Sequence, residues 1–279
     1  MIKKITKVTG IILLLGFSFF YTEKVTQIIK KKDPIMIKLN ETKKDNYMQM
    51  IKPIIIDDEY IMGISGCEVD IEKSYNKMKR FGEYKDKLIV MKEVENKNIN
   101  DKYIISGNKL NKNVGIIILL NNNTNKELIN YIQNKKIKIN YFVDHQYLED
   151  NTAAIKFISE NSNIYYLGKD KKYYDEYMLY ANNLIEINSN NKSNLCLLNE
   201  KDKDMLKLCS DYNMKTIKTD IITNNILSNI KEKLSNGAII TIDSDDVDQI
   251  KVALNYITSK GYNMVTLDKL LNQKKLCNN

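Results

Sequence analysis

Histidine and clustered carboxylates are the side chains best suited to acid–base or metal chemistry, and this sequence of 279 residues holds a single histidine, His145. Three carboxylates, Asp243, Asp245 and Asp246, follow an apolar run near the C-terminus. Such a cluster can hold a cation weakly through its oxygens. The favoured interpretation is helix capping, because aspartate accepts hydrogen bonds from the free N–H groups of a first helical turn. His145 is interpreted as a solvated loop residue.

Tyrosines are dense within and just after a predicted strand at 164–167. Tyrosine rings can stack on sugar rings, so Tyr165, Tyr166 and Tyr173 are predicted glycan contacts, with Tyr174 and Tyr177 beside them. The alternative is that these rings pack at the rim of a core.

The four cysteines contain no CxxC pair, which argues against a zinc ribbon or a thioredoxin-like site. In an exported protein Cys196 and Cys209 could form a disulfide. The favoured interpretation is that both are small core residues, one on a strand and one on a helix.

The net charge of +8 does not indicate a nucleic-acid partner. Lysines are scattered among acidic residues, there is no arginine-rich stripe, and no nucleic-acid-binding module is recognised. We interpret the charge as a solvated surface.

The N-terminus has the layout of an export signal. Residues 1–7 carry three lysines, and Val8–Tyr21 is an uncharged apolar run. The run is shorter than the roughly 20 residues of a typical membrane span. At its end, Phe19, Phe20, Tyr21 and Glu23 are bulky or charged, where a signal peptidase would need small residues. We therefore predict an uncleaved signal anchor at 1–23, with membrane attachment through residues 8–21. The rest of the protein would lie outside the cell. A cleaved signal peptide and an exported protein are the alternative.

Beyond the anchor, the sequence predicts a stalk (24–50), a small α+β unit (51–108), an α/β domain (109–273) and a tail (274–279). In the α/β domain, apolar strands alternate with amphipathic helices, as in βα units. About seven strands favour a distorted (β/α) barrel. The predicted strands include 114–120, 139–143, 164–167, 195–198, 238–242 and 264–267, and the predicted helices include 126–133, 152–160, 202–211, 227–234 and 247–259.

Three segments of this domain resemble the polysaccharide deacetylase family, also called the NodB homology domain or carbohydrate esterase family four. They are KIKINYFVDHQYL, ILSNIKEKLSNGAIITID and ALNYITSKGYNMVTLDKLL. The resemblance covers about 113–271 and implies the same barrel. It also implies removal of acetyl groups from glycans by a divalent metal such as zinc, held by one Asp and two His. A second Asp would act as general base and a further His as general acid.

The same alignment places none of those side chains in this chain. The two Asp positions hold leucines, the two metal-binding His positions hold a leucine and a lysine, and the acid His position holds an aspartate. Leucine cannot ligate a metal, so the resemblance implies no catalytic residue, no bound metal and no cofactor. The degenerate positions are Leu119, Leu120, Leu167, Lys171 and Asp243.

The sequence therefore predicts a membrane-anchored, extracytoplasmic, deacetylase-like protein that is catalytically inactive. It would bind cell-wall glycan or act as a scaffold. The alternative is an active peptidoglycan or chitooligosaccharide deacetylase that works through a non-standard site.

Overall fold

The computed structural model describes residues 16–277, except 19, 23, 46–49, 95–99, 123, 125, 169–171, 190 and 273–276. The chain forms two compact units. The first contains residues 1–50, 65–94 and 274–279, and the second contains 51–64 and 95–273. Most of the predicted anchor lies outside the described residues. Within the described part, no helix is both long and apolar enough to span a bilayer.

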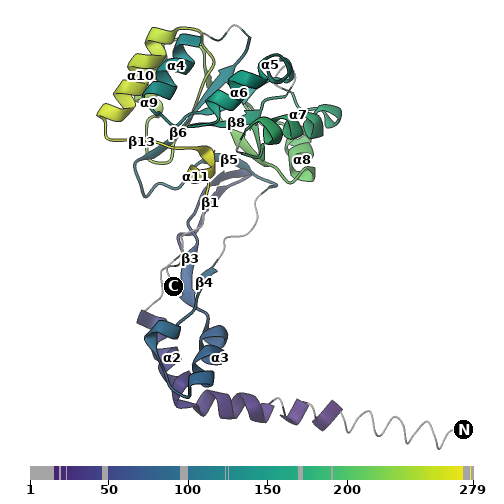
Figure 1. Ribbon diagram of the computed structural model, residues 1–279, viewed down its shortest axis with the longest axis vertical. Coiled ribbons are helices and arrows are strands. Elements are labelled where there is room, and N and C mark those ends of the chain that lie inside the picture. Colours follow the sequence, from purple (N-terminus) through teal and green to yellow (C-terminus); the bar gives the residue numbers. More distant parts are fainter. Residues whose placement is uncertain are drawn as a thin grey trace, which may run out of the picture. The chain divides into compact units, whose positions relative to one another are not determined.

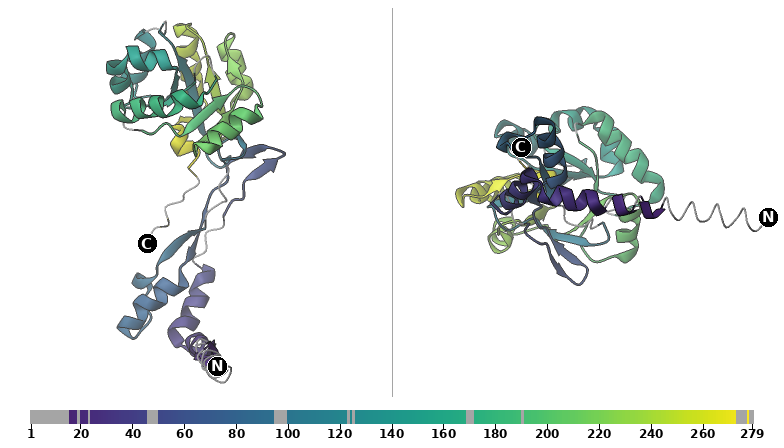
Figure 2. Two further views of the ribbon diagram at one scale, coloured as in Figure 1. Left: turned by 90° about the vertical axis from the view of Figure 1, so that its right-hand side faces the viewer. Right: turned by 90° about the horizontal axis from the view of Figure 1, so that it is seen from below.

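The first unit packs two helices beside a two-stranded antiparallel sheet (Figure 2). Its elements are α2 (Pro34–Asp45), β3 (Gly66–Val69), α3 (Ile71–Phe81), the 3₁₀ turn η1 (Asp86–Leu88) and β4 (Met91–Val94). Helix α3 begins where Asp70 accepts a hydrogen bond from the N–H of Lys73, and it ends at Gly82, whose φ is 75°. The unit buries an apolar cluster of Ile35, Met36, Leu39, Val69, Tyr75 and Met78.

These units differ from the predicted segments. The predicted stalk, 24–50, includes helix α2, whose buried residues form part of the core of the first unit. The predicted α+β unit, 51–108, is divided between the two units. Residues 51–64 join the second unit because their strand β2 pairs in parallel with β5, which in turn pairs with β10.

The second unit contains two sheets built mainly of parallel strands (Figure 1). One sheet has the order β11-β12-β6-β7-β8, with β13 also pairing with β6; the other has the order β1-β2-β5-β10-β9. The strands of the first are β6 (Asn113–Leu120), β7 (Asn140–Val143), β8 (Asn163–Tyr166), β11 (Ile221–Ile222), β12 (Ile239–Ile242) and β13 (Asn263–Met264). Those of the second are β1 (Ile54–Ile56), β2 (Glu59–Ile61), β5 (Tyr103–Ser106), β9 (Leu195–Leu198) and β10 (Lys215–Lys218).

Helices connect these strands, as the alternating pattern predicted. They are α4 (Lys126–Asn134), α5 (His145–Asp150), α6 (Thr152–Ile158), α7 (Asp175–Asn188), α8 (Lys203–Asp211), α9 (Ile226–Lys233), α10 (Val247–Ser259) and α11 (Leu267–Leu270). The α/β class with parallel strands is therefore confirmed.

Strand β6 shows how side-chain alternation divides the core of this unit. Ile116, Ile118 and Leu120 belong to the larger apolar cluster, which contains the buried faces of the helices. Ile117 and Leu119 belong to a second cluster with residues from both sheets, here called the inner cluster. Its members are Tyr60, Met62, Ile104, Ile117, Leu119, Phe142, Tyr165, Leu167, Leu195, Leu197, Ile217, Ile239, Val265, Leu267, Leu270 and Leu271.

Side chains, not strand pairing, join the facing edges β8 and β9 of the two sheets. The Tyr173 hydroxyl accepts a hydrogen bond from the N–H of Leu197 at 2.8 Å and donates one to the Tyr166 carbonyl at 3.0 Å. The Ser193 hydroxyl oxygen accepts the N–H of Tyr166 at 2.9 Å. Elsewhere an isolated antiparallel bridge links Ser106, the last residue of β5, to Ala238, which directly precedes β12.

Candidate functional site

The carboxyl ends of the parallel strands lie along one edge, where α/β folds place their ligand sites. The pairing of β12 with β6 sets Ile242 opposite Ile118. On the other side of β6, the registers through β7 and β8 set Leu120 opposite Val143 and Val143 opposite Tyr166. We call the end of these four strands the carboxyl edge. The aligned site positions 119, 120, 167 and 243 all lie in or just after these strands.

The structure brings two of the aligned leucines together. Leu119 and Leu167 are 5% and 6% exposed, and both belong to the inner cluster with Phe142 and Tyr165. Leu120 lies on the opposite face of β6, in the larger cluster. Lys171 lies outside the described residues. Two positions that would need charged or imidazole side chains for hydrolysis are thus part of the hydrophobic core.

Asp243 directly follows β12 and is partly buried, and its backbone N–H donates a hydrogen bond to the Ile222 carbonyl at 2.9 Å. Asp246 caps helix α10: its carboxylate accepts hydrogen bonds from the backbone N–H and the side-chain amide of Gln249, at 3.0 and 2.7 Å. The capping interpretation of this carboxylate cluster is confirmed for Asp246.

The residues at the carboxyl edge do not fit a divalent metal. Leu119, Leu120 and Leu167 offer no lone pair to a cation. Within the described ranges, no group of three or more His, Cys, Asp or Glu side chains is arranged to hold one.

The predicted glycan contacts are wrong for the three tyrosines. Tyr165, Tyr166 and Tyr173 are 0%, 0% and 1% exposed, so a sugar ring cannot reach their faces. Burial raises the pKa of both Tyr165 and Tyr173, because a phenolate would be poorly solvated there. Tyr165 stacks on Phe142 with ring centroids 5.0 Å apart, and Tyr173 bridges the sheet edges. Both tyrosines therefore have structural roles.

Two other tyrosines are open to solvent. Tyr174, which directly precedes α7, is 44% exposed, and Tyr180, within α7, is 46% exposed. The first lies in the tyrosine-rich segment singled out from the sequence. The second lies beyond it, and helical spacing from Tyr177 was the signal that could have found it.

His145 is not a solvated loop residue, as the sequence had suggested. It is the first residue of α5, which Asp144 caps by accepting the N–H of Tyr147. The His145 ring lies 5.0 Å from the Tyr177 ring and 5.7 Å from the Tyr180 ring. The Nε2 atom is 3.4 Å from the Glu149 carboxylate. A half-buried imidazole thus lies among aromatic rings beside the carboxyl edge.

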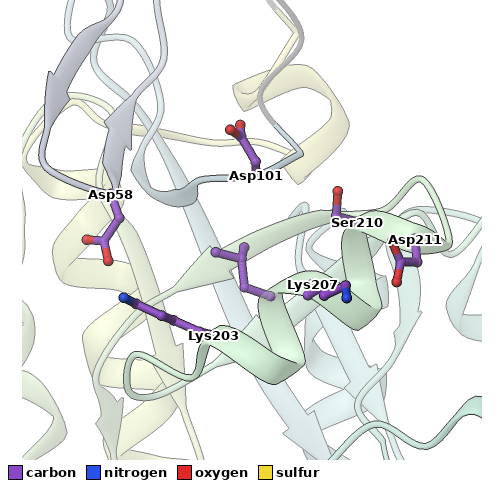
Figure 3. A pocket seen from close by; sticks show the side chains of 7 residues that line it. Asp58, Asp101, Lys203, Lys207, Ser210 and Asp211 are labelled. Carbon is purple, nitrogen blue, oxygen red and sulfur yellow. The ribbon is translucent and has the colours of Figure 1, made fainter.

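A pocket of about 350 Å³ lies elsewhere in this unit, along helix α8 (Figure 3). None of the aligned site positions lines it. Its lining residues are Asp58, Asp101, Lys203, Leu206, Lys207, Ser210 and Asp211.

All four cysteines are paired, which corrects the interpretation of Cys196 and Cys209 as reduced core residues. Cys196 on β9 bonds to Cys209 on α8, with 6.4 Å between Cα atoms. In the first unit, Cys67 bonds to Cys277, with 5.7 Å between Cα atoms.

No protein-family model matches the sequence. A search of curated proteins also finds no match. Solved structures do match. A mutant of a CE4 family pseudoenzyme aligns with a TM-score of 0.60 and 20% identity, over 88% of this chain and 100% of that one. The wild-type pseudoenzyme, from Bacillus anthracis, gives a TM-score of 0.59 at 20% identity, over 88% and 97%. A further mutant, with restored enzymatic activity, gives 0.58 at 19% identity, over 88% and 100%.

A structure described as a deacetylase aligns over less of this chain. A peptidoglycan N-acetylglucosamine deacetylase gives a TM-score of 0.52 at 14% identity, over 62% of this chain and 95% of that one. The likeness to the pseudoenzyme thus extends beyond the predicted deacetylase-like segment. These matches confirm the α/β fold with parallel sheets, which is similar to that of family 4 carbohydrate esterase structures.

Proposed function

We propose that this chain is a degenerate member of the polysaccharide deacetylase family that has no hydrolytic activity and binds glycan at the cell envelope. The observation that carries the inactive state is the burial of Leu119 and Leu167 in one apolar cluster. Activation of water needs a metal or a positioned base at this point, and aliphatic side chains supply neither. Similarity in fold to a CE4 family pseudoenzyme supports the proposal. We also propose that the two sheets are an opened form of the family's distorted barrel.

The proposed location outside the cell rests on the cysteines and on the N-terminal sequence. Two disulfides use all four cysteines, and such pairs persist mainly in oxidising compartments. The basic and apolar layout of residues 1–21 is that of a signal anchor. Both features favour a body that faces the outside of the membrane.

The proposed glycan surface comprises Tyr174, Tyr177, Tyr180 and His145. Tyr177 links the exposed rings to His145: Tyr174 contacts Tyr177 at 6.5 Å between centroids, and His145 lies against both Tyr177 and Tyr180. Exposed aromatic faces held by neighbouring rings can stack on sugars without losing much side-chain entropy. The surface follows β7 and β8, so it borders the carboxyl edge.

The inactive state is tested by metal analysis and by acetate release from chitooligosaccharides and peptidoglycan. We expect substoichiometric zinc and no acetate above the no-protein control. A matched variant, Asp243→Asn, should behave like the wild type. Tightly bound zinc, or acetate release that Asp243→Asn abolishes, would show instead an active deacetylase with a non-standard site.

Glycan binding is tested by titrating chitooligosaccharide into the protein and by pulldown on insoluble peptidoglycan. Tyr174→Ala and Tyr180→Ala should each weaken binding. Leu179→Ala is the control, because Leu179 is 62% exposed on the same helix but has no aromatic ring. If the wild type does not bind, or if all three variants bind equally well, the glycan proposal fails and a scaffold role is favoured.

A further inference from the structure

The net positive charge of the chain lies entirely in the first unit. This unit holds 19 of the 43 Lys and Arg residues but only 10 of the 35 Asp and Glu residues, which gives it a formal net charge of +9. Without the predicted anchor at 1–23, the unit still carries +7. The second unit holds the other 24 basic and 25 acidic residues, a net charge of −1. A partner that recognises the first unit by its charge must therefore be anionic.

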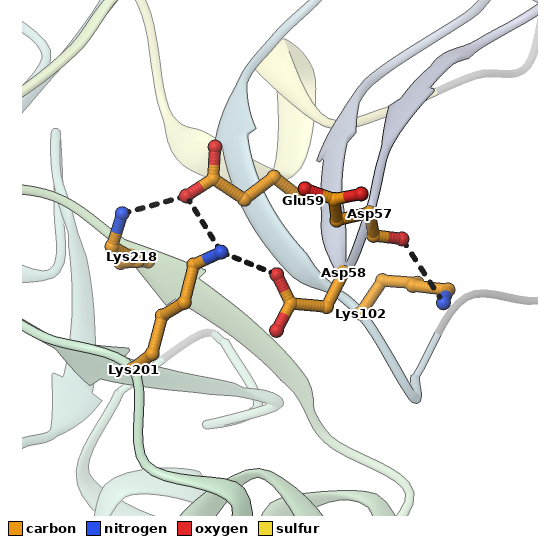
Figure 4. Close-up of polar contacts among 6 residues, drawn as sticks. All are labelled: Asp57, Asp58, Glu59, Lys102, Lys201 and Lys218. Carbon is orange, nitrogen blue, oxygen red and sulfur yellow. Dashed lines mark hydrogen bonds and ion pairs between the residues drawn. The ribbon is translucent and has the colours of Figure 1, made fainter.

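In the second unit, lysines and carboxylates compensate each other locally, as at the turn between β1 and β2 (Figure 4). Lys201 lies 2.5 Å from the Asp58 carboxylate and 3.4 Å from that of Glu59. Lys218, the last residue of β10, lies 2.8 Å from Glu59. These ion pairs lower the pKa of both Asp58 and Glu59, chiefly through the hydrogen bond each accepts from a lysine. Both carboxylates are therefore ionised at neutral pH and balance the two lysines.

The helical segment 24–32 of the first unit leaves two lysines without such a balance. Lys30 is paired, because its ammonium lies 3.1 Å from the Glu72 carboxylate and 5.0 Å from the centre of the Tyr75 ring, both on α3. These contacts identify the side of the segment that lies against the unit. Lys31 and Lys32 are exposed, and neither forms an ion pair with a carboxylate in the described part of the chain. Two adjacent positive charges thus remain available to an anionic partner.

The same segment exposes apolar side chains beside these lysines. Ile28 and Ile29 are 55% and 66% exposed. Helical spacing places Ile28, Lys31 and Lys32 on one side of the segment, away from the side of Lys30. A bilayer surface accommodates this mixture, because apolar side chains reach the acyl chains while lysine ammonium groups stay at the lipid phosphates. A charged polymer in water would pair with the lysines but would leave the isoleucines exposed. The composition of this side therefore favours a lipid surface.

We propose that the helical segment 24–32 lies along a membrane surface that contains anionic phospholipid, with Ile28 and Ile29 at the acyl chains and Lys31 and Lys32 at lipid phosphates. This contact depends on the proposed signal anchor, which would bring the segment to the bilayer, and it adds a second contact with a defined lipid class. If the helix instead stood upright on the membrane, its rise of 1.5 Å per residue would place Ile28 about 10 Å beyond Tyr21, outside the acyl chains. The depth of Ile28 therefore distinguishes the two arrangements.

The depth is tested by fluorescence. The chain contains no tryptophan, so Ile28→Trp gives the full chain a single reporter. The protein is reconstituted into vesicles of phosphatidylcholine with brominated acyl chains, which quench tryptophan, either alone or mixed with phosphatidylglycerol. We expect Ile28→Trp to be quenched more strongly, and to emit at shorter wavelength, when phosphatidylglycerol is present. Ile187→Trp is the control, because Ile187 is 78% exposed on α7 in the second unit. Its quenching should not depend on phosphatidylglycerol.

The role of charge is tested in the chain that carries Ile28→Trp. Each lysine near an anionic surface favours binding about fivefold, so Lys31→Glu together with Lys32→Glu should shift the segment toward its unbound position by at least about 25-fold. The extra quenching should disappear, as it should in high salt. Lys156→Glu together with Lys207→Glu is the matched control. Both lysines are exposed on helices of the second unit, so the net charge changes equally, and the extra quenching should remain.

Flotation of the same vesicles separates this contact from the anchor. If the chain floats with both kinds of vesicle but Ile28→Trp is quenched equally in both, or in neither, the surface contact is overturned and the anchor stands. Equal loss of quenching in the two double variants would also overturn it, because total charge and not the placement of the lysines would then control binding. A chain that floats with neither kind of vesicle would overturn the anchor and the surface contact together.

Discussion

Replacing Tyr173 by phenylalanine should strongly destabilise the second unit, although the change removes a single oxygen atom. The hydroxyl accepts the N–H of Leu197 and donates to the carbonyl of Tyr166. These two groups belong to β9 and β8, the facing edges of separate sheets. Tyr166, Tyr173 and Leu197 are 0%, 1% and 2% exposed, so water cannot easily take the place of the lost oxygen.

The size of the effect follows from the groups left without a partner. A buried N–H or C=O that loses its hydrogen bond costs about 1–3 kcal/mol. Tyr173→Phe removes the acceptor of the Leu197 N–H and a donor to the Tyr166 carbonyl, so the free energy of unfolding should fall by about 2–6 kcal/mol. With a urea dependence of about 2 kcal/mol per molar, the midpoint of unfolding should fall by about 1–3 M. Circular dichroism during urea denaturation measures it.

Tyr141→Phe is the matched control. Tyr141 is also fully buried, on β7, but its hydroxyl makes no hydrogen bond within the described residues. Removing it should leave stability unchanged or raise it by up to about 1 kcal/mol. The reasoning fails if Tyr173→Phe is as stable as the wild type, or if both variants lose the same amount. Equal losses would mean that the size of the cavity, and not the hydrogen bonding, sets the cost.

Four further predictions address the disulfide, the Asp33 carboxylate of the first unit, a glycine turn and the absence of a metal site. Replacing both Cys196 and Cys209 by alanine removes a disulfide between residues 13 positions apart in the sequence. The free energy of unfolding, measured by urea denaturation, should fall by about 3 kcal/mol. Asp33 accepts hydrogen bonds from Lys79 and Tyr75, and the first of these is the main reason its pKa lies below the ordinary 3.8. The Asp33 carboxylate therefore stabilises the first unit fully above about pH 4, and this stabilisation is lost as the pH falls through the lowered pKa. Hydrogen exchange of the α3 amides should become faster at acid pH in the wild type, and the change should be smaller in Asp33→Asn. At Gly237, with φ of 81°, an added Cβ would lie 2.6 Å from the Gly107 carbonyl oxygen, whereas at Gly82, with φ of 75°, it would meet nothing within 4 Å. Gly82→Ala should therefore lose only about 1–2 kcal/mol of stability, from the backbone conformation alone. Gly237→Ala should lower the melting temperature by clearly more than Gly82→Ala does. A protein with a specific zinc site gains about 4 kcal/mol of stability when zinc is present at 1,000 times the dissociation constant. For this protein, we expect that neither added zinc nor a chelator shifts the melting temperature.

Much of the second unit could be predicted because its strands and helices carry strong local patterns. Strand β6 is a nearly continuous apolar run, as expected of a parallel strand covered on both faces. Helix α10 has its apolar residues Ile250, Ala253, Leu254 and Ile257 on one side. The helix cap at Asp246 was also readable, because capping depends on residues that are adjacent in sequence.

Contacts between distant parts of the chain could not be predicted in the same way. Tyr173 lies outside any periodic element, and its burial follows from two sheet edges that leave backbone groups unpaired between them. The Cys196–Cys209 disulfide depends on how α8 packs on the sheet. The hairpin β1–β2 belongs to the second unit only because β2 pairs with β5, a contact that the local sequence does not encode.

The leucines at the carboxyl edge also explain how this fold can persist without a metal. A carboxylate at the position of Leu119 would face Phe142, Tyr165 and Leu167 in the inner cluster, and a buried charge without a partner is costly. A bound cation offsets that cost in a metalloenzyme and so couples folding to metal binding. Leucine removes both the cost and the need for the cation, because its side chain extends the apolar contact between the sheets. On this reasoning, introducing Leu119→Asp alone should damage the fold before it produces any chemistry, since the carboxylate would arrive without the ligands that make it useful.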